Sequence, residues 1–173
     1  LSDLYDAFLK KNDRQSNTEY YLQYITVKKT KQDGNEVFEV IDGQQRLTTL
    51  TLLFNILEKY FETENIAKKS DNYLLQYSRY IGTDTNIFDI IHDLLDEPTT
   101  DIEKVEEQDK FYLYGAAKTI CTFFKILKEN DGEKFIPFVD FIKNDVKIIL
   151  NKEDEFTSAE EVFSSLNANK VPL

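Results

Sequence analysis

The sequence contains very few of the residues from which metal centres and disulfide frameworks are built. Its 173 residues include one cysteine and one histidine, and neither methionine nor tryptophan. The single cysteine, Cys121, excludes a disulfide framework and is typical of a reducing compartment, so we expect a cytoplasmic protein. One cysteine and one histidine are also too few for a zinc site made from these ligand types.

Long apolar stretches and an excess of positive charge are absent as well. No apolar run approaches the length needed to cross a bilayer and no signal peptide is visible, so no membrane partner is expected. The net charge of −11 disfavours DNA binding through the overall field, because duplex binding is largely phosphate neutralisation. Lys28, Lys29 and Lys31 form the only tight basic cluster, which we interpret as a solvated hairpin.

The residues that are present make an ordinary globular composition, with 41% hydrophobic and 31% charged residues. Their periodicity predicts an α+β fold, in which a small mixed sheet with an antiparallel hairpin packs with a predominantly helical part. The hairpin is predicted from alternating residues 19–30 and 36–41 around an Asp-Gly-Asn turn. Helices are predicted over residues 1–11, 44–62, 86–95, 104–129, 135–142 and 158–167, and a buried returning strand over 145–150.

We expect one compact unit with two unlike halves. Residues 1–65 carry the sheet, whereas residues 66–173 are mainly helical and contribute the returning strand. The chain begins with Leu1 rather than methionine, and we therefore expect a fragment of a longer protein, with DNA bound only by the full-length molecule.

The sequence is organised around the junction between the second predicted strand and the long helix, where Asp42 and Gly43 form a turn. Asp42 is predicted to be the N-cap, with Gln45 three residues later. A helix start presents free N–H groups and the positive end of its dipole, Gly43 permits close approach, and Arg46 adds a guanidinium. These features favour an anion site, with phosphate as the ligand. The alternative, a plain turn with Arg46 solvated, stays open.

Two segments resemble a known family. Residues 40–50, VIDGQQRLTTL, resemble the signature of the GmrS-like N-terminal domain, which occurs in GmrSD-type modification-dependent restriction enzymes and related phage-defence proteins. Residues 159–167, AEEVFSSLN, are similar to the downstream Phe-x-x-Leu-Asn segment of that family. The likeness extends over nearly the whole chain, although the usual opening Arg/Gln/aromatic segment is missing and Lys170 stands where glycine is common.

The resemblance implies a ParB/sulfiredoxin-like fold, whose Gly-x-x-Arg helix start binds nucleotide phosphates. It implies NTP as the ligand, and Mg²⁺ is expected as the accompanying ion. The residues expected to bind the nucleotide are Gly43, Arg46, Thr48 and Asn167. The candidates for a role in hydrolysis are Asp42, as cap or metal ligand, and Gln44 and Gln45, which would orient water.

The resemblance also implies a role in bacterial restriction, with DNA cut by a separate HNH-type nuclease domain or subunit. A non-enzymatic module that docks a partner nuclease through its acidic helices is the alternative. A third hypothesis, a metal-dependent nuclease on the acidic segment 84–109, has an incomplete ligand set in His92, Asp93 and Asp96. Arg79 is interpreted as an exposed side chain rather than a second phosphate contact.

Overall fold

The structure is a computed structural model that describes residues 1–14, 19–32, 34–61 and 108–153, together with isolated positions between 158 and 164. Within these residues the chain forms four helices and three strands, which confirms the predicted α+β class. The helices are α1 (Ser2–Arg14), α2 (Gln44–Phe61), α4 (Gln108–Asn130) and α5 (Gly132–Asn144). The strands are β1 (Tyr20–Gln32), β2 (Asn35–Asp42) and β3 (Val146–Glu153).

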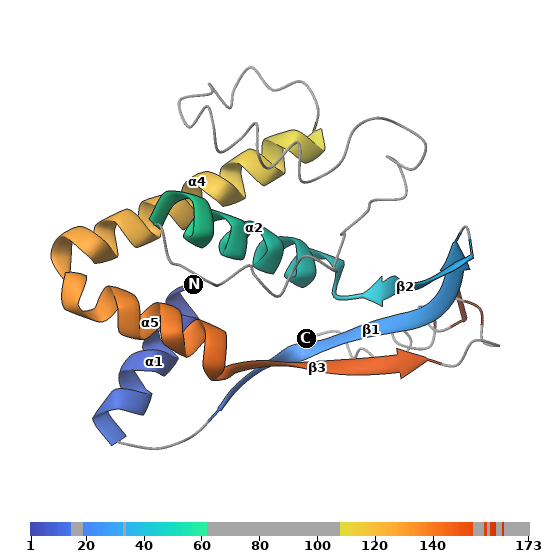
Figure 1. Cartoon of the computed structure of the whole chain (residues 1–173), viewed down its shortest axis with the longest axis horizontal. Helices are drawn as coiled ribbons and strands as arrows, with labels where there is room; N and C mark the ends of the chain where they lie inside the picture. Colours follow the sequence, from blue (N-terminus) through green and yellow to red (C-terminus); the bar gives the residue numbers. More distant parts are fainter. Residues whose placement is uncertain are drawn as a thin grey trace.

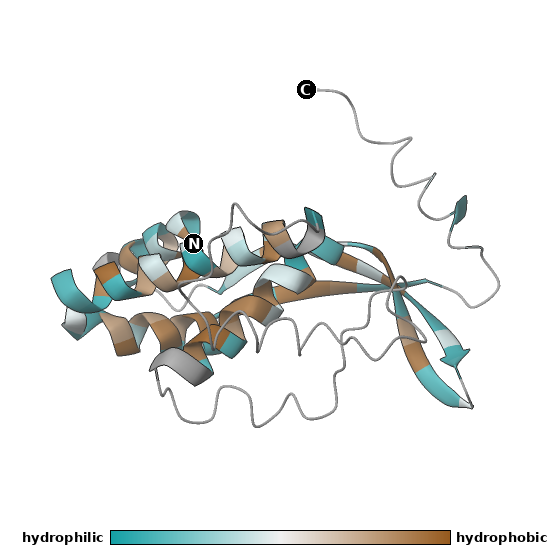
Figure 2. Ribbon diagram, turned by 90° about the horizontal axis from the view of Figure 1, so that it is seen from above, coloured by the Kyte–Doolittle hydropathy of each residue, from teal (hydrophilic) through white to brown (hydrophobic). Residues whose placement is uncertain are grey.

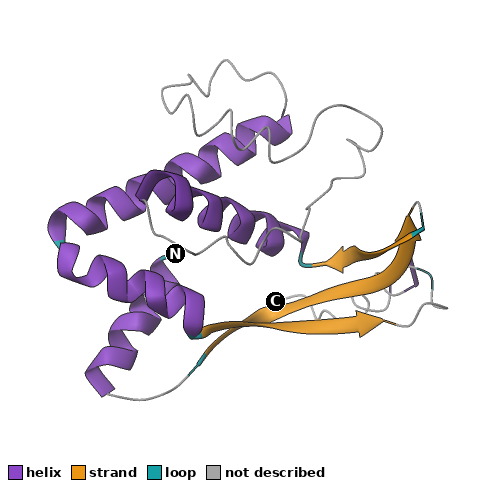
Figure 3. Ribbon diagram, in the orientation of Figure 1, coloured by secondary structure: helices purple, strands orange, loops and turns teal. Residues whose placement is uncertain are grey.

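The three strands form a mixed sheet in the order β2-β1-β3, and the sheet extends away from the helices (Figures 1 and 3). β1 and β2 make the predicted antiparallel hairpin, with Gly34 at a φ of 83° in the turn. β3 returns parallel to β1, starting from the pair Tyr20–Val146. The predicted hairpin and returning strand are therefore confirmed.

The central strand β1 pairs with β2 on one side and with β3 on the other, and a β-bulge interrupts each of these pairings. In β1, Gln23 and Tyr24 together occupy the space opposite one residue of β3. In β2, Ile41 is the extra residue. Asp42 pairs with Thr26 and Val40 pairs with Val27, which leaves Ile41 without a partner in β1. A bulge leaves residues out of the ladder and bends the strand. Both bulges lie close to the end of β2 that leads into α2.

The hydrophobic core lies among the helices and along the adjoining part of the sheet. The sequence of α4 has apolar residues three or four positions apart, which is the spacing of one helix face, and these residues are all buried: Leu113, Ala117, Ile120, Phe124 and Leu127. Phe138 of α5 is fully buried, and its ring centroid lies 5.1 Å from that of Tyr5 and 5.4 Å from that of Phe8 in α1. Figure 2 shows hydrophobic residues along the helices and the neighbouring strands, and hydrophilic residues toward the hairpin end.

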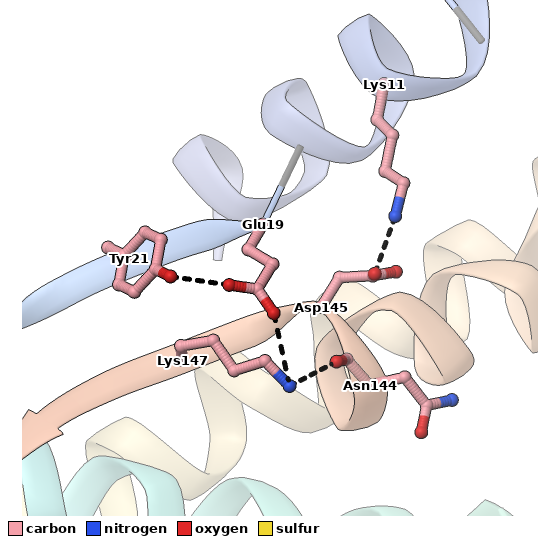
Figure 4. A network of polar contacts seen from close by, with 6 residues as sticks. All are labelled: Lys11, Glu19, Tyr21, Asn144, Asp145 and Lys147. Carbon is pink, nitrogen blue, oxygen red and sulfur yellow. Dashed lines mark hydrogen bonds and ion pairs between the residues drawn. The ribbon is translucent and has the colours of Figure 1, made fainter. Parts of the chain in front are cut away.

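A group of polar contacts fastens the start of β1 to the neighbouring elements (Figure 4). Lys11 of α1 forms an ion pair of 2.6 Å with Asp145, the residue between α5 and β3. The backbone carbonyl of Asp145 accepts a hydrogen bond of 2.8 Å from the Tyr20 N–H, and Glu19 lies 3.9 Å from Lys147 of β3. The first helix, the central strand and the returning strand therefore meet at one end of the sheet.

Two predicted details are wrong. The strand predicted to be buried, β3, has Ile148, Ile149 and Leu150 exposed by 41%, 51% and 50%. These consecutive residues point to opposite faces of the sheet, and of the described β3 residues only Val146 packs against the helical core. The helix predicted over 135–142 begins at Gly132, so Pro137 lies inside it rather than in its first turn. Pro137 is exposed on α5, and so is Glu133, the residue whose carbonyl loses its helical donor to the proline.

Several predictions concern segments outside the described residues. They are the helix over 86–95, the boundary near residue 65, Arg79 and the acidic segment with His92. No group of three metal-ligating side chains occurs in the part of the chain that the structure describes. A search of the described helices for one long and apolar enough to cross a membrane found none.

Candidate anion-binding site

The strand β2 passes into helix α2 through Gly43, and the five residues Asp42–Arg46 are called the α2 corner below. The Leu47 N–H donates a hydrogen bond of 3.0 Å to the Gly43 carbonyl, which is the first bond of the helix. Gly43, and not the predicted Asp42, therefore occupies the N-cap position. Asp42 is instead the last residue of β2, paired with Thr26, so its carboxylate is free to approach the first turn of α2.

Gly43 is required by the fold at this point. Its φ is +92°, a conformation that residues with a Cβ rarely adopt. A Cβ at this position would lie 2.9 Å from Ile25 Cγ1 and 3.2 Å from Ile25 Cα, so α2 starts in close contact with β1. Ile25 therefore occupies, on this side of Gly43, the space that was predicted for a ligand. The role of Gly43 in nucleotide binding stays a prediction.

Arg46 is held against the β1 bulge. Its Nη1 donates to the Gln23 Oε1 at 3.3 Å and to the Tyr24 carbonyl at 3.2 Å. Its Nη2 lies 3.6 Å from the Asp42 carboxylate, and 28% of the side chain is exposed. The guanidinium is therefore fixed by groups from β1 and β2, and is not a freely solvated side chain.

Two polar atoms, one in the α2 corner and one beside it, are buried without a hydrogen-bond partner in the described structure. They are Arg46 Nε and the hydroxyl oxygen of Thr26, which is fully buried and lies opposite Asp42 in the β1–β2 register. Buried polar groups are nearly always satisfied, and an exception often marks the place of a water, an ion or a ligand. α-Helix geometry also leaves the N–H groups of Gln44, Gln45 and Arg46 without partners inside the helix.

The other predicted residues of the first turn differ in their surroundings. Gln44 Nε2 donates to the Val40 carbonyl at 3.0 Å, which ties this side chain back to β2. The Thr48 hydroxyl donates to the Gln44 carbonyl at 2.9 Å. Gln45 is exposed, and its side chain forms no hydrogen bond with another described residue. The predicted residues Asp42–Arg46 and Thr48 therefore lie together at one corner of the structure.

The sequence predictions missed Gln23, Tyr24 and Thr26. None of them belongs to the motif, and their positions depend on bulges that the alternating pattern of β1 does not reveal. Asn167, which is predicted to bind the nucleotide, is outside the described residues.

The comparison with protein families gives one result. The family model described as "GmrSD restriction endonuclease, N-terminal domain" matches residues 1–173, the whole chain. The predicted resemblance is therefore confirmed. No curated protein and no solved structure matches the chain, so the likeness to the ParB/sulfiredoxin fold stays a prediction.

Proposed function

The chain belongs to the family of GmrSD restriction endonuclease N-terminal domains, and from this premise we propose that its α2 corner binds the phosphates of a nucleoside triphosphate. The family assignment supports a role in restriction and phage defence. In this proposal the domain senses or hydrolyses NTP, and a separate HNH-type nuclease domain or subunit cuts the DNA.

The unsatisfied donors at the α2 corner carry the proposal. Arg46 Nε is buried without an acceptor, and the first N–H groups of α2 have no partner inside the helix. A helix N-terminus also carries a partial positive charge of about half an elementary charge. An oxyanion supplies acceptors for the donors and negative charge for the dipole, and phosphate matches both.

The Asp42 carboxylate gives Mg²⁺ a place in the proposal. It lies 3.6 Å from Arg46 Nη2, so a phosphate that reaches this guanidinium also comes near a carboxylate. Like charges at such a distance repel each other, and a divalent cation held by oxygen ligands relieves the repulsion. Asp42 and the phosphate oxygens are the proposed ligands of that ion. Gln45, whose amide is exposed, is better placed than Gln44 to orient a water for hydrolysis.

The test is the affinity of the chain for ATP, GTP and inorganic triphosphate, measured by isothermal titration calorimetry with and without Mg²⁺. Because a charge-assisted hydrogen bond contributes about 1.5–3 kcal/mol, Arg46→Ala should weaken binding at least about tenfold. Lys118→Ala, which removes an exposed positive charge from α4, is the matched control and should change nothing. Unchanged affinity in a folded Arg46→Ala variant would contradict the proposal.

A second candidate function, a non-enzymatic module that docks a partner nuclease, is favoured by β3. This strand lies at an edge of the described sheet with three consecutive half-exposed apolar side chains, Ile148 to Leu150. Edge strands of this kind pair readily with a strand from another chain. A thermal shift of several degrees with NTP and Mg²⁺ would favour the first function. Its absence, together with binding of the nuclease domain that Ile149→Lys abolishes, would favour the second.

A further inference from the structure

We propose that Gln23 is a positioning residue for Arg46, and that it turns the Nε–Nη2 edge of the guanidinium toward the bound oxyanion. The proposal rests on the proposed function, because it concerns the same α2 corner. It assigns a role to a residue outside the motif, on a different element of the fold.

The bulge in β1 is what makes Gln23 available. Gln23 and Tyr24 take part in neither the β1–β2 nor the β1–β3 register, although both strands pair with β1 nearby. A residue left out of the ladder has a backbone carbonyl available for another partner, and a bulge changes the direction of the side chains beside it. Here the Tyr24 carbonyl and the Gln23 Oε1 both accept hydrogen bonds from Arg46 Nη1.

Accounting for the five N–H donors of the guanidinium shows which edge is left. The two acceptors from the bulge match the two N–H groups of Nη1. Nε is buried and has no acceptor, and Nη2 lies 3.6 Å from the nearest Asp42 oxygen, beyond hydrogen-bond distance. The Nε–H and one Nη2–H lie parallel on one edge of the planar group. This pair forms the fork that binds two oxygens of a phosphate or carboxylate at once.

Fixing Nη1 therefore does two things for an oxyanion. The two hydrogen bonds to Nη1 prevent an oxyanion from binding across Nη1 and Nη2, the other pair of donors in the guanidinium. They also restrict the rotation of the long Arg46 side chain before the ligand arrives. Such pre-organisation improves affinity by reducing what must be ordered on binding. Asp42 lies nearest the remaining edge, so the incoming anion displaces this carboxylate or shares it with a cation.

The experiment is a double-mutant cycle on the 173-residue chain, with inorganic triphosphate as the probe in isothermal titration calorimetry. Gln23→Met keeps the length of the side chain and removes the oxygen that holds Nη1. It should weaken binding about three- to tenfold, the range expected for losing the order of one flexible side chain. In the Arg46→Ala background the same substitution should have no further effect. Gln32→Met, a half-buried glutamine at the hairpin end of β1, is the matched control and should leave affinity unchanged.

The outcomes separate this inference from the function on which it rests. If Arg46→Ala leaves affinity unchanged, the anion site itself is wrong. If Arg46→Ala weakens binding and Gln23→Met does not, or strengthens it, the positioning role is overturned and the anion site survives. An equal loss with and without Arg46 would mean that Gln23 touches the ligand directly, which also overturns the proposal.

A measurement on the unsubstituted chain covers the case in which Gln23→Met fails to fold. The ¹⁵N–¹H signal of Arg46 Nε, followed by NMR, should shift on addition of triphosphate because the anion becomes its acceptor. An Nε signal that stays in place while backbone signals of the α2 corner shift would overturn the proposal.

Discussion

Gly43 is subject to two constraints, a left-handed backbone and contact with Ile25, and a substitution can separate them. Gly43→Ala should lower the free energy of unfolding by about 2–5 kcal/mol, the sum of the conformational cost and of overpacking against β1. Chemical denaturation followed by circular dichroism measures this change. Gly34 has a similar φ of 83° but no atom within 4 Å of its missing Cβ, so Gly34→Ala should cost only about 1–2 kcal/mol. Equal losses in the two variants would show that the Ile25 contact contributes nothing.

At the level of single residues, the motif could be placed from sequence, but its surroundings could not. The change from strand to helix at Gly43 follows from local spacing, and the structure has it at that residue. The partners of Arg46 come from a bulge in β1 that forms opposite β3, and pairing between distant segments leaves no mark on local periodicity. The N-cap was predicted one residue too early because the strand pairing of Asp42 outcompetes its propensity to cap.

The elements are joined by aromatic packing, in which Phe138 of α5 is central. Its ring lies within 6 Å of Tyr5, Phe8, Phe123 and Phe124, which come from α1 and α4. Phe138→Ala should therefore lower the free energy of unfolding by about 3–5 kcal/mol, through lost burial and the cavity that remains.

The control for Phe138→Ala lies two residues earlier on the same helix. Ile136 is 55% exposed, and Ile136→Ala should change the unfolding free energy by less than about 0.5 kcal/mol in urea denaturation. Similar losses for the two substitutions would mean that α5 does not pack as described.

Sequence periodicity predicted which helix faces are buried better than which strands are. The α4 stripe is identified by its spacing because a helix of this length has one face for the core. An apolar run such as Ile148–Leu150 indicates a strand, but its burial depends on which elements cover the two faces of the sheet. Of the described β3 residues only Val146 packs against the helical core, and the side chains of Ile148–Leu150 further along are half exposed.

The charge of the whole molecule bears on its partners. Because its net charge is −11, we expect this chain not to bind duplex DNA at 150 mM salt, even at micromolar protein concentrations. Proteins that bind DNA non-specifically, with dissociation constants of about 1–100 µM, are still detected under such conditions. Fluorescence anisotropy of a labelled duplex measures this. The basic cluster near the hairpin is partly neutralised, since Lys29 pairs with Glu36 and its hydrogen bond lowers the pKa of that carboxyl. Salt-sensitive binding that is lost in Lys28→Ala would contradict the expectation.

For the whole molecule, the fold class and the family could be predicted from the sequence. Composition, the periodicity of each segment and a long contiguous motif can all be recognised without knowing which segments of the chain contact each other. The packing of α2 against α4 and the register in which β3 pairs with β1 could not be predicted from the sequence, since they depend on contacts between segments far apart in the chain.

The parallel pairing of β1 with β3 has a consequence for how the protein is made. The hairpin and the start of α2 are contiguous in the sequence, so they can assemble early during synthesis. The second side of β1 receives its partner only when the ribosome has produced β3, after α4 and α5. Closing such a long loop is slow compared with forming a hairpin. A nascent chain that ends before β3 therefore has one edge of its middle strand without a partner, and we expect the pairing of β3 to be slower than the formation of the hairpin.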